Sequence, residues 1–303
     1  MNDIPVEQQR AGFIAIVGAP NAGKSTLVNG LVGTKVSIVS PKVQTTRTRV
    51  LGIVMAGPAQ LVFVDTPGIF QPKRRLERAM VAAAWTGAGD ADVVVVMIDA
   101  SRGLDDDSRG IIEKLKDGGR PLAVALNKVD TMHREKLLVL AAQVNELAPF
   151  ERIFMISALT GDGVPDLLAW CAEKMPASPW LFPEDQLSDM PDRLLAAEVT
   201  REKLFLQLHQ ELPYACTVET ETWEERADGS VRIDQVVYVQ RDGQKAIVLG
   251  KSGRQIKAVG AAARTELEEL LERRVHLFLY VKVRENWLDD RERYRELGLD
   301  YDA

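Results

Sequence analysis

Residues 18–25 have the sequence of a loop that binds phosphate. The run GAPNAGKS, from Gly18 to Ser25, matches G-x-x-x-x-G-K-S/T, follows an apolar run and precedes a segment that favours a helix. Its glycines allow backbone N–H groups to point inward around phosphate oxygens, and the start of the helix adds a partial positive charge. Lys24 can reach the β- and γ-phosphates, and the Ser25 hydroxyl can bind Mg²⁺. The expected nucleotide contacts in this loop are Gly18, Ala19, Pro20, Asn21, Ala22, Gly23, Lys24, Ser25 and Thr26.

A second motif has the chemistry needed to read guanine. The run NKVD, from Asn127 to Asp130, directly follows a later apolar run, and such crevices open at the carboxyl ends of parallel strands. The Asp130 carboxylate can accept the N1–H and 2-amino hydrogens of guanine, whereas adenine lacks those donors. On its own the same string could be a solvated helix cap, and the phosphate loop before it favours the guanine reading. The expected base contacts are Asn127, Lys128 and Asp130, with a backbone N–H from Ser157, Ala158 or Leu159.

Two further segments can hold a metal ion and the γ-phosphate. Asp65 ends a predicted strand and opens the run DTPG, whose glycine, Gly68, can present its backbone N–H to the γ-phosphate. Between the two motifs, the polar segment 44–48 contains threonines that can complete a metal shell; Thr46 is the first choice and Thr45 the second. These threonines would also suit an edge strand. The expected metal ligands are Ser25, Thr46 and Asp65, the expected catalytic residues Lys24, Thr46 and Gly68, and further expected nucleotide contacts Thr66 and Pro67.

The residue after Gly68 is Ile69, which cannot orient water in the way that glutamine does in many small GTPases. We therefore expect slow intrinsic hydrolysis that a partner or an ion accelerates. With this hydrophobic residue, residues 13–160 resemble the Era branch of the translation-factor-like GTPases. The resemblance implies GTP or GDP with Mg²⁺ as ligands, and in related GTPases without the glutamine a P-loop asparagine helps to hold K⁺. Asn21 occupies that position here.

The elements that must position these motifs form an α/β pattern. Short apolar runs alternate with helix-like stretches, which indicates a doubly wound, mostly parallel sheet covered on both faces. The predicted strands cover 13–17, 61–64, 93–98, 121–126 and 153–156. Four prolines between positions 176 and 191 mark a linker. We expect a GTPase domain over 1–175, a linker over 176–191, a smaller α+β domain over 192–285 and an acidic tail over 286–303.

The second domain contains a basic loop. Its expected elements are a helix over 194–210, strands over 214–223 and 231–240, a glycine loop, a helix over 255–272 and a strand over 276–283. Between positions 241 and 264 stand six basic residues and one acid, a local charge of +5 in a chain of net charge −6. The G-x-x-G run at 250–253 lies inside this patch, and its glycines allow close approach to a phosphodiester backbone. The expected RNA contacts are Gly250, Lys251, Ser252, Gly253, Arg254 and Lys257.

With both halves in view, the chain resembles the Era family almost from end to end, including the run 281–283 followed by Trp287. The resemblance implies a type II KH fold, binding to the 3′ end of small-subunit (16S) ribosomal RNA, and a role in 16S rRNA processing and 30S subunit biogenesis. It also implies peripheral attachment to the inner face of the cell membrane. The acidic segment 285–303 gives no independent support for that attachment.

Composition excludes several other classes. The chain of 303 residues is 46% hydrophobic, has no signal-peptide layout and contains no apolar run long enough to span a bilayer, so we expect a cytoplasmic monomer. Cys171 and Cys216 lack metal-ligand spacing and are expected to be buried thiols. The competing readings are a signalling GTPase whose C-terminal domain docks a protein or the membrane, and a P-loop ATPase. Asp130 opposes the second, and the basic G-x-x-G loop opposes the first.

Overall fold

The computed structural model of the chain describes residues 4–43, 45–285 and 287–303. It divides into two units, which are described one at a time. The first comprises Met1–Ser37, Thr46–Asp189 and Gly298–Ala303, and the second comprises Ile38–Thr45 and Met190–Leu297. The division after Asp189 falls inside the proline-rich stretch expected to be a linker. The assignment of Ile38–Thr45 to the second unit has no signal in the sequence.

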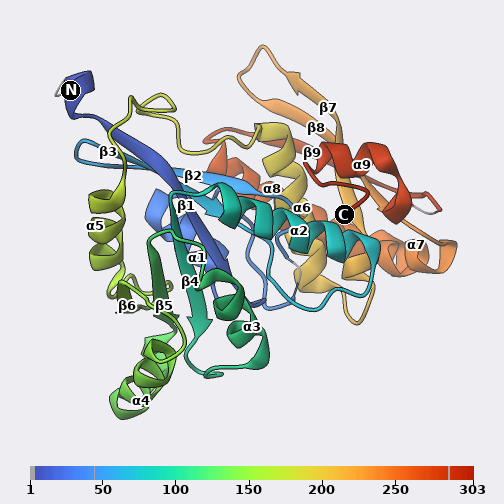
Figure 1. Cartoon of the computed structure of the whole chain (residues 1–303). Coiled ribbons are helices and arrows are strands. Elements are labelled where there is room, and N and C mark those ends of the chain that lie inside the picture. Colours follow the sequence, from blue (N-terminus) through green and yellow to red (C-terminus); the bar gives the residue numbers. More distant parts are fainter. Residues whose placement is uncertain (1–3, 44, 286) are drawn as a thin grey trace. The chain divides into compact units, whose positions relative to one another are not determined.

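The first unit is built on a six-stranded sheet (Figure 1). Its order is β2-β3-β1-β4-β5-β6, and every neighbouring pair is parallel except β2 with β3. Every residue of β3, β4 and β5 is buried, which is typical of strands covered on both faces. The strands are β1 (Arg10–Gly18), β2 (Val50–Ala56), β3 (Ala59–Asp65), β4 (Val93–Asp99), β5 (Leu122–Asn127) and β6 (Arg152–Met155).

Five helices accompany this sheet within the described part of the first unit. They are α1 (Lys24–Val32), α2 (Arg75–Asp90), α3 (Asp106–Leu115), α4 (Arg134–Asn145) and α5 (Val164–Lys174). Because β1, β3, β4 and β5 are parallel, their carboxyl ends lie at one edge of the sheet. The functional motifs follow these ends, so the topology brings them together. The expected doubly wound, mostly parallel sheet is confirmed.

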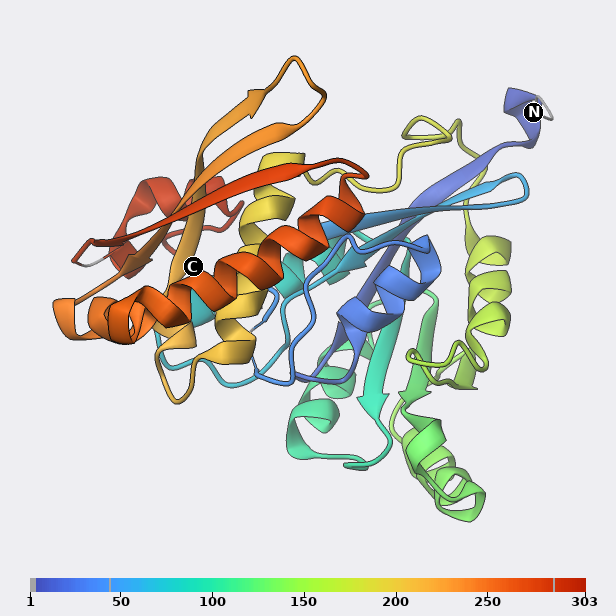
Figure 2. The same ribbon diagram turned by 180° about the vertical axis from the view of Figure 1, so that it is seen from behind.

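The second unit contains a three-stranded sheet with α6 and α8 packed on one face. The order is β7-β8-β9, with β7 antiparallel to β8 and β8 parallel to β9. One core cluster joins Leu204 of α6 and Val259 of α8 to Val237 and Val281 of the sheet, and Figure 2 shows α8 running alongside β9. The elements are α6 (Asp192–Gln207), β7 (Thr217–Glu225), β8 (Val231–Val239), α7 (Asp242–Leu249), α8 (Arg254–Leu270), β9 (Val275–Val283) and α9 (Arg291–Glu296).

Residues 287–297, expected to belong to an acidic tail, are folded against the second unit. Trp287 is buried and donates its ring N–H to the Ala215 carbonyl at 3.1 Å. Tyr294 is also buried, and the Arg293 guanidinium lies 4.7 Å from the ring centre of Tyr238 on β8. This segment therefore covers part of the sheet face opposite α6 and α8.

Candidate functional site

The phosphate loop follows β1 and is tightly packed. A Cβ on Gly18 would lie 2.4 Å from the Met97 carbonyl oxygen, and a Cβ on Gly23 would lie 2.2 Å from the Asn127 side-chain nitrogen. Gly23 has φ of 100° and Asn21 has φ of 65°, so both occupy the left-handed region. Only glycine fits at positions 18 and 23, and the loop delivers the chain directly into the start of α1.

Lys24 is the first residue of α1 and is buried. Its ammonium donates to the carbonyl oxygens of Gly18, at 3.2 Å, and Ala19, at 3.1 Å. Burial lowers the pKa of Lys24 to about 8, and the neighbouring Asp65 carboxylate opposes that shift. Phosphate oxygens in the loop would favour the charged form of this lysine, as the predicted role in binding the β- and γ-phosphates requires.

Asp65 has the environment of a metal ligand. It is fully buried, and its Oδ2 accepts a hydrogen bond from the Ser37 hydroxyl at 2.7 Å. Its Oδ1 is buried and has no hydrogen-bond partner among the described residues. Burial raises the pKa of Asp65, opposed by hydrogen bonds from Ser37 and Ser25 and by the charge of Lys24. An unpartnered buried carboxylate oxygen beside hydroxyl groups fits a hard divalent cation such as Mg²⁺.

The two threonines considered as metal ligands, Thr45 and Thr46, have different surroundings in the structure. The Thr46 hydroxyl lies 3.0 Å from that of Ser25, the other expected ligand. The Thr45 hydroxyl instead pairs with Ser40 at 2.6 Å and donates to the Lys42 carbonyl at 2.8 Å, within the second unit. This arrangement favours Thr46 as the ligand. Gln44, in the same expected segment, lies outside the described residues.

Asn127 joins three loops of the site. It is buried at the end of β5 and donates a side-chain N–H to the Ala22 carbonyl at 2.8 Å. Its side-chain oxygen accepts the backbone N–H of Ala158, also at 2.8 Å. Asn127 therefore holds the phosphate loop and the segment 157–159 together. Ser157 donates its backbone N–H to the Asp162 carbonyl, so two of the three candidates for the one N–H expected to face guanine already have protein partners.

The residue next to Asn127 reaches back to a carboxylate that the sequence did not single out. Lys128 has φ of 68°, and its ammonium lies 2.5 Å from Oδ2 of Asp99, at the end of β4. Oδ1 of Asp99 accepts the backbone N–H and hydroxyl of Ser101. Burial raises the pKa of Asp99, but the hydrogen bonds from Lys128 and Ser101 outweigh burial and leave the pKa below its ordinary value. Asp130 is exposed, in a single helical turn just after Lys128.

Gly68 and Ile69 are held in place by close packing and by one backbone hydrogen bond. A Cβ on Gly68 would lie 2.9 Å from Cα of Pro20, which brings this segment against the phosphate loop. The Ile69 backbone N–H donates to the Gly18 carbonyl at 3.1 Å, and its side chain is buried in the core cluster that contains Ala84. Nearby, the Thr66 hydroxyl donates to a carbonyl of β1, and Pro67 is buried. Ile69 therefore offers no polar group to water.

In the second unit, the G-x-x-G loop joins two helices. Gly250, Ser252 and Gly253 all have positive φ, of 69°, 55° and 74°. A Cβ on Gly250 would lie 2.7 Å from that of Gln255, so this position also requires glycine. The 17-residue helix α8 begins immediately after Gly253, and its N-terminus directs partial positive charge to the loop. Helix α7, which precedes the loop, was not among the expected elements.

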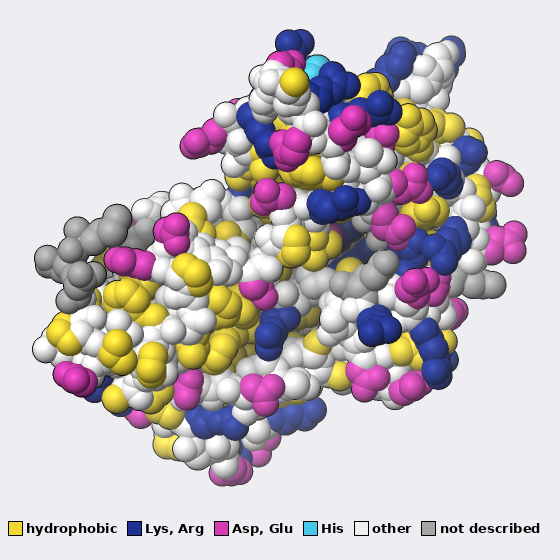
Figure 3. All heavy atoms as spheres, turned by 90° about the horizontal axis from the view of Figure 1, so that it is seen from above, with side chains coloured by type: hydrophobic (Ala, Val, Ile, Leu, Met, Phe, Trp, Pro, Cys, Tyr) yellow, Lys and Arg dark blue, Asp and Glu magenta, His cyan; other side chains and the backbone are white. Residues whose placement is uncertain are grey.

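The basic residues around this loop lack acidic partners. Among the described residues, none of Lys251, Arg254 and Lys257 forms an ion pair, and all three are exposed. Elsewhere in the same unit, Lys203 pairs with Glu202 and Arg232 pairs with Asp234. On the face drawn in Figure 3, basic and acidic side chains are intermixed. The cations of the loop are therefore available to an anionic ligand.

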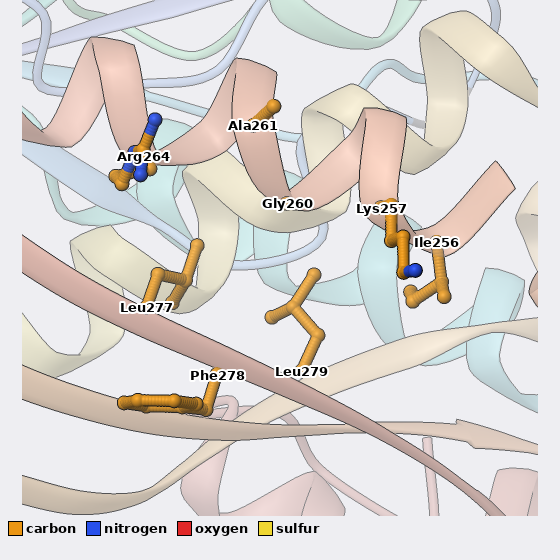
Figure 4. Close-up of a pocket in the computed structure, with 8 residues that line it drawn as sticks. All are labelled: Ile256, Lys257, Gly260, Ala261, Arg264, Leu277, Phe278 and Leu279. Atoms are coloured by element: carbon orange, nitrogen blue, oxygen red, sulfur yellow. The ribbon is translucent and has the colours of Figure 1, made fainter. Parts of the chain in front are cut away.

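A groove lies beside these cations, between α8 and β9 (Figure 4). Its volume is about 310 Å³. Leu277 and Leu279 point from the strand toward the helix, whereas Phe278 leaves the strand on the other side. The α8 residues that line it are Ile256, Lys257, Gly260, Ala261 and Arg264. An apolar floor with cations at its margin suits bases and phosphates of a single strand.

Comparison with known proteins matches both units. Residues 13–128 match a family model described as 50S ribosome-binding GTPase, and residues 211–288 match the KH domain. GTPase Era of Brucella suis is 63% identical over 97% of this chain and 94% of its own length. The chain belongs to the Era family of GTPases. GTPase Era of Dinoroseobacter shibae is 60% identical over 96% of both chains.

Two solved Era structures cover 96% of this chain and 99% of their own, each with a TM-score of 0.91 and 39% identity. One is an Aquifex aeolicus Era variant bound to GDP and AlF4⁻. The other is Era in complex with MgGDPNP and nucleotides 1506–1542 of 16S ribosomal RNA. The fold predicted from the sequence, a P-loop GTPase domain followed by a KH domain, is confirmed.

Asp130→Asn should convert the Era guanine site toward xanthine. The amide loses the charge-assisted hydrogen bonds to N1–H and the 2-amino group, at a cost of about 3 kcal/mol, or roughly a hundredfold in GTP affinity. Xanthine presents a carbonyl at the 2-position, to which the new amide can donate. Calorimetric titrations with guanine, xanthine and adenine diphosphates measure this directly. Glu135→Gln, an exposed carboxylate change at the start of α4, is the matched control. Equal affinities of the parent for ADP and GDP would contradict the guanine assignment.

Asp99→Asn should weaken nucleotide binding through Lys128. The loss of a charged partner releases the side chain of Lys128, an expected base contact, so that its methylene stem is no longer held in one position. We expect about tenfold faster release of a fluorescent GDP analogue, measured by stopped flow. In a double-mutant cycle, Asp99→Asn should add little to Lys128→Ala. Asp92→Asn, directly before the start of β4, is the control. Additive effects in the cycle would show that Asp99 does not act through Lys128.

Proposed function

We propose that this Era-family GTPase binds the 3′ end of 16S ribosomal RNA through its KH unit and acts in 16S rRNA processing and 30S subunit biogenesis. The observation that carries the proposal is the set of unpaired cations around the G-x-x-G loop, beside a groove with an apolar floor. The likeness to an Era structure whose ligands are MgGDPNP and 16S rRNA nucleotides supports it. The nucleotide site and the RNA site lie on separate units, so their functions are separable by mutation.

At the nucleotide site, the chain's own groups orient the γ-phosphate and neutralise its charge. Mg²⁺, when bound by Ser25, Thr46 and Asp65, supplies Lewis-acid stabilisation of phosphate oxygens. Lys24 reaches the β- and γ-phosphates, and the Gly68 backbone N–H meets the γ-phosphate. Since Asp65 is buried with an unpartnered oxygen, a cation bound there would favour the ionised form of that carboxylate. These roles are proposed for the residues predicted from the sequence.

Intrinsic turnover is proposed to be slow, because Ile69 is part of the core and cannot position water. A K⁺ ion near Asn21 is the further element that the family resemblance implies, and it stays a prediction. Asn21 lies in the phosphate loop, where its backbone is left-handed.

Membrane attachment also stays a prediction. No helix in the described part of the chain is long and apolar enough to cross a membrane. Residues 285–303 are acidic, which opposes contact with an anionic lipid surface. A signalling GTPase that docks a protein is the alternative, and the unpaired cations of the G-x-x-G loop favour RNA over it.

The segment Ile38–Thr45 supports coupling between the nucleotide state and the KH unit. It lies between Ser37, which donates to Asp65, and Thr46, an expected metal ligand. Ser37 and Thr46 belong to the first unit, whereas Ile38–Thr45 belongs to the second. In that segment the Val39 backbone N–H donates to Glu202 at 2.8 Å, and the Thr45 carbonyl accepts from Arg201 at 2.5 Å.

The same segment caps a helix. Lys42 donates its ammonium to the carbonyls of Phe205 and Leu208, at the C-terminal end of α6. A cation at this position satisfies carbonyls that the helix itself leaves unpaired. We therefore propose that ordering of Thr46 by Mg·GTP changes how the segment is held on α6.

Lys42→Ala should uncouple the two ligands. In the parent, RNA affinity is expected to differ at least fivefold between the GTP-analogue and GDP states, a coupling of about 1 kcal/mol. Without the ammonium contacts to α6, that ratio should approach one. RNA binding by fluorescence anisotropy in each nucleotide state measures the ratio. Val43→Ala, an exposed neighbour, is the control. An unchanged ratio in Lys42→Ala, with folding intact, would remove Lys42 from the coupling.

Replacing Lys251 and Ser252 together with Asp should abolish RNA binding and leave GTP affinity unchanged. Two carboxylates would then face the phosphodiester backbone at the tip of the G-x-x-G loop. In the parent, log K should fall with log[salt] at about −0.7 per neutralised phosphate, which gives a slope near −2 to −3 for three or four contacts. Anisotropy titrations with a single-stranded 3′-terminal 16S segment and a scrambled strand test both points. Undiminished RNA binding by the double variant would require reassigning the KH unit to protein docking.

A further inference from the structure

The face of the KH sheet turned away from α8 carries two exposed aromatic rings. Side chains alternate along β9, and Leu277, Leu279 and Val281 pack toward the helices. Phe278 and Tyr280 leave the opposite face, with 44% and 48% of their surfaces exposed. Among the described residues they are the aromatic side chains exposed to that degree. We call this pair the β9 platform.

Groups suited to nucleic acid flank the β9 platform. On the neighbouring strand, the Arg232 guanidinium lies 5.2 Å from the ring centre of Phe278. Cross-strand pairing places Arg232 opposite His276 and Val236 opposite Tyr280. Rings and guanidinium planes are the surfaces on which unpaired bases stack. The C-terminal segment, with Tyr294 buried, covers a different part of this face, around Tyr238.

The charges beside the platform differ from those around the G-x-x-G loop. Arg232 is held by Asp234 at 2.9 Å, and Lys282 is held by Glu221 at 2.9 Å. These two cations beside the platform are therefore already paired with carboxylates, unlike Lys251. Such a surface contributes to RNA binding through stacking rather than through release of counterions.

The platform is continuous with the proposed RNA groove. Phe278 contributes to the lining of the groove between α8 and β9, although its ring points away from α8 (Figure 4). A strand that leaves the groove across β9 meets Phe278 first and Tyr280 two residues further along the strand. We propose that the β9 platform stacks bases of the single-stranded RNA that continues beyond the groove. This inference rests on the proposed RNA function and adds a second surface to it.

RNAs of different lengths can distinguish the contribution of the groove from that of the β9 platform. A KH groove holds about four nucleotides, so a four-nucleotide RNA fills the groove, which Phe278 lines, without reaching Tyr280. A ten-nucleotide RNA reaches both. The test therefore measures the affinity of each RNA by fluorescence anisotropy for the full chain and for Phe278→Ala, Tyr280→Ala and Tyr280→Phe. Thermal denaturation checks that each variant is folded.

We expect Tyr280→Ala to weaken binding of the ten-nucleotide RNA about tenfold and to leave the four-nucleotide RNA unchanged. Phe278→Ala should weaken binding of both RNAs, because Phe278 also lines the groove. Tyr280→Phe should bind like the parent, because the ring is retained. The salt dependence should be the same in Tyr280→Ala as in the parent, whereas Lys257→Ala should lower the slope by about 0.7. Leu138→Ala, an exposed apolar residue of α4, is the control for loss of surface area.

Two results would contradict the proposal that the β9 platform stacks RNA bases. Parent-like binding of the ten-nucleotide RNA by Tyr280→Ala would reassign the exposed ring of Tyr280 to a protein partner. Equal losses of affinity for the short and long RNAs in Tyr280→Ala would show that this ring acts only through the groove. Failure of the parent to bind either RNA would instead defeat the proposed function itself, so the two failures are distinguishable.

Discussion

The burial of two opposite charges at one edge of a parallel sheet is the constraint on which the nucleotide site depends. Asp65 and Lys24 are both buried. Burial raises the pKa of Asp65 and lowers the pKa of Lys24, and each shift favours the neutral form of the side chain. Within the chain they compensate each other only in part, since Oδ1 of Asp65 keeps no hydrogen-bond partner. A divalent cation and a polyphosphate provide the missing charges together. Burial of these two charges is therefore unfavourable in the chain alone and becomes more favourable when the ligands bind, which favours tight binding.

The KH unit follows the same principle at its surface. Several of its cations are neutralised by nearby carboxylates, as in the pair Arg273 with Glu225, and such pairs contribute little to affinity for an anion. Around the G-x-x-G loop the described cations have no such partners, and the N-terminus of α8 adds to their field. The distribution of pairing, rather than the net charge of −6, therefore distinguishes an RNA-binding edge from the rest of an acidic chain.

The sequence predicted the parts of the site that are local in the chain. The phosphate loop, the NKVD motif and Asp65 each carry their chemistry in a few consecutive residues, and parallel topology then brings them together. Asp99 was missed because its role depends on the register of β4 with β5, which sets it opposite Asn127. Helix α7 was missed because it has only eight residues and is followed directly by Gly250, so the sequence analysis assigned it to the glycine loop. The placement of Ile38–Thr45 depends on contacts with α6 more than 150 residues away, which no local pattern encodes.

Ile69 links the core to the chemistry. Its side chain belongs to the cluster beneath the sheet, and its backbone N–H is bonded to the Gly18 carbonyl, so the turn that carries Gly68 is fixed against Pro20 by packing. A polar residue able to orient water would have to leave this cluster and would lose that anchor. Position 69 therefore offers no polar side chain to orient water, while the turn that carries Gly68, the proposed γ-phosphate contact, is held in place by packing. The proposed slow hydrolysis follows from that arrangement, because water would have to be positioned by an outside group, and a long-lived GTP state suits the proposed role in subunit biogenesis.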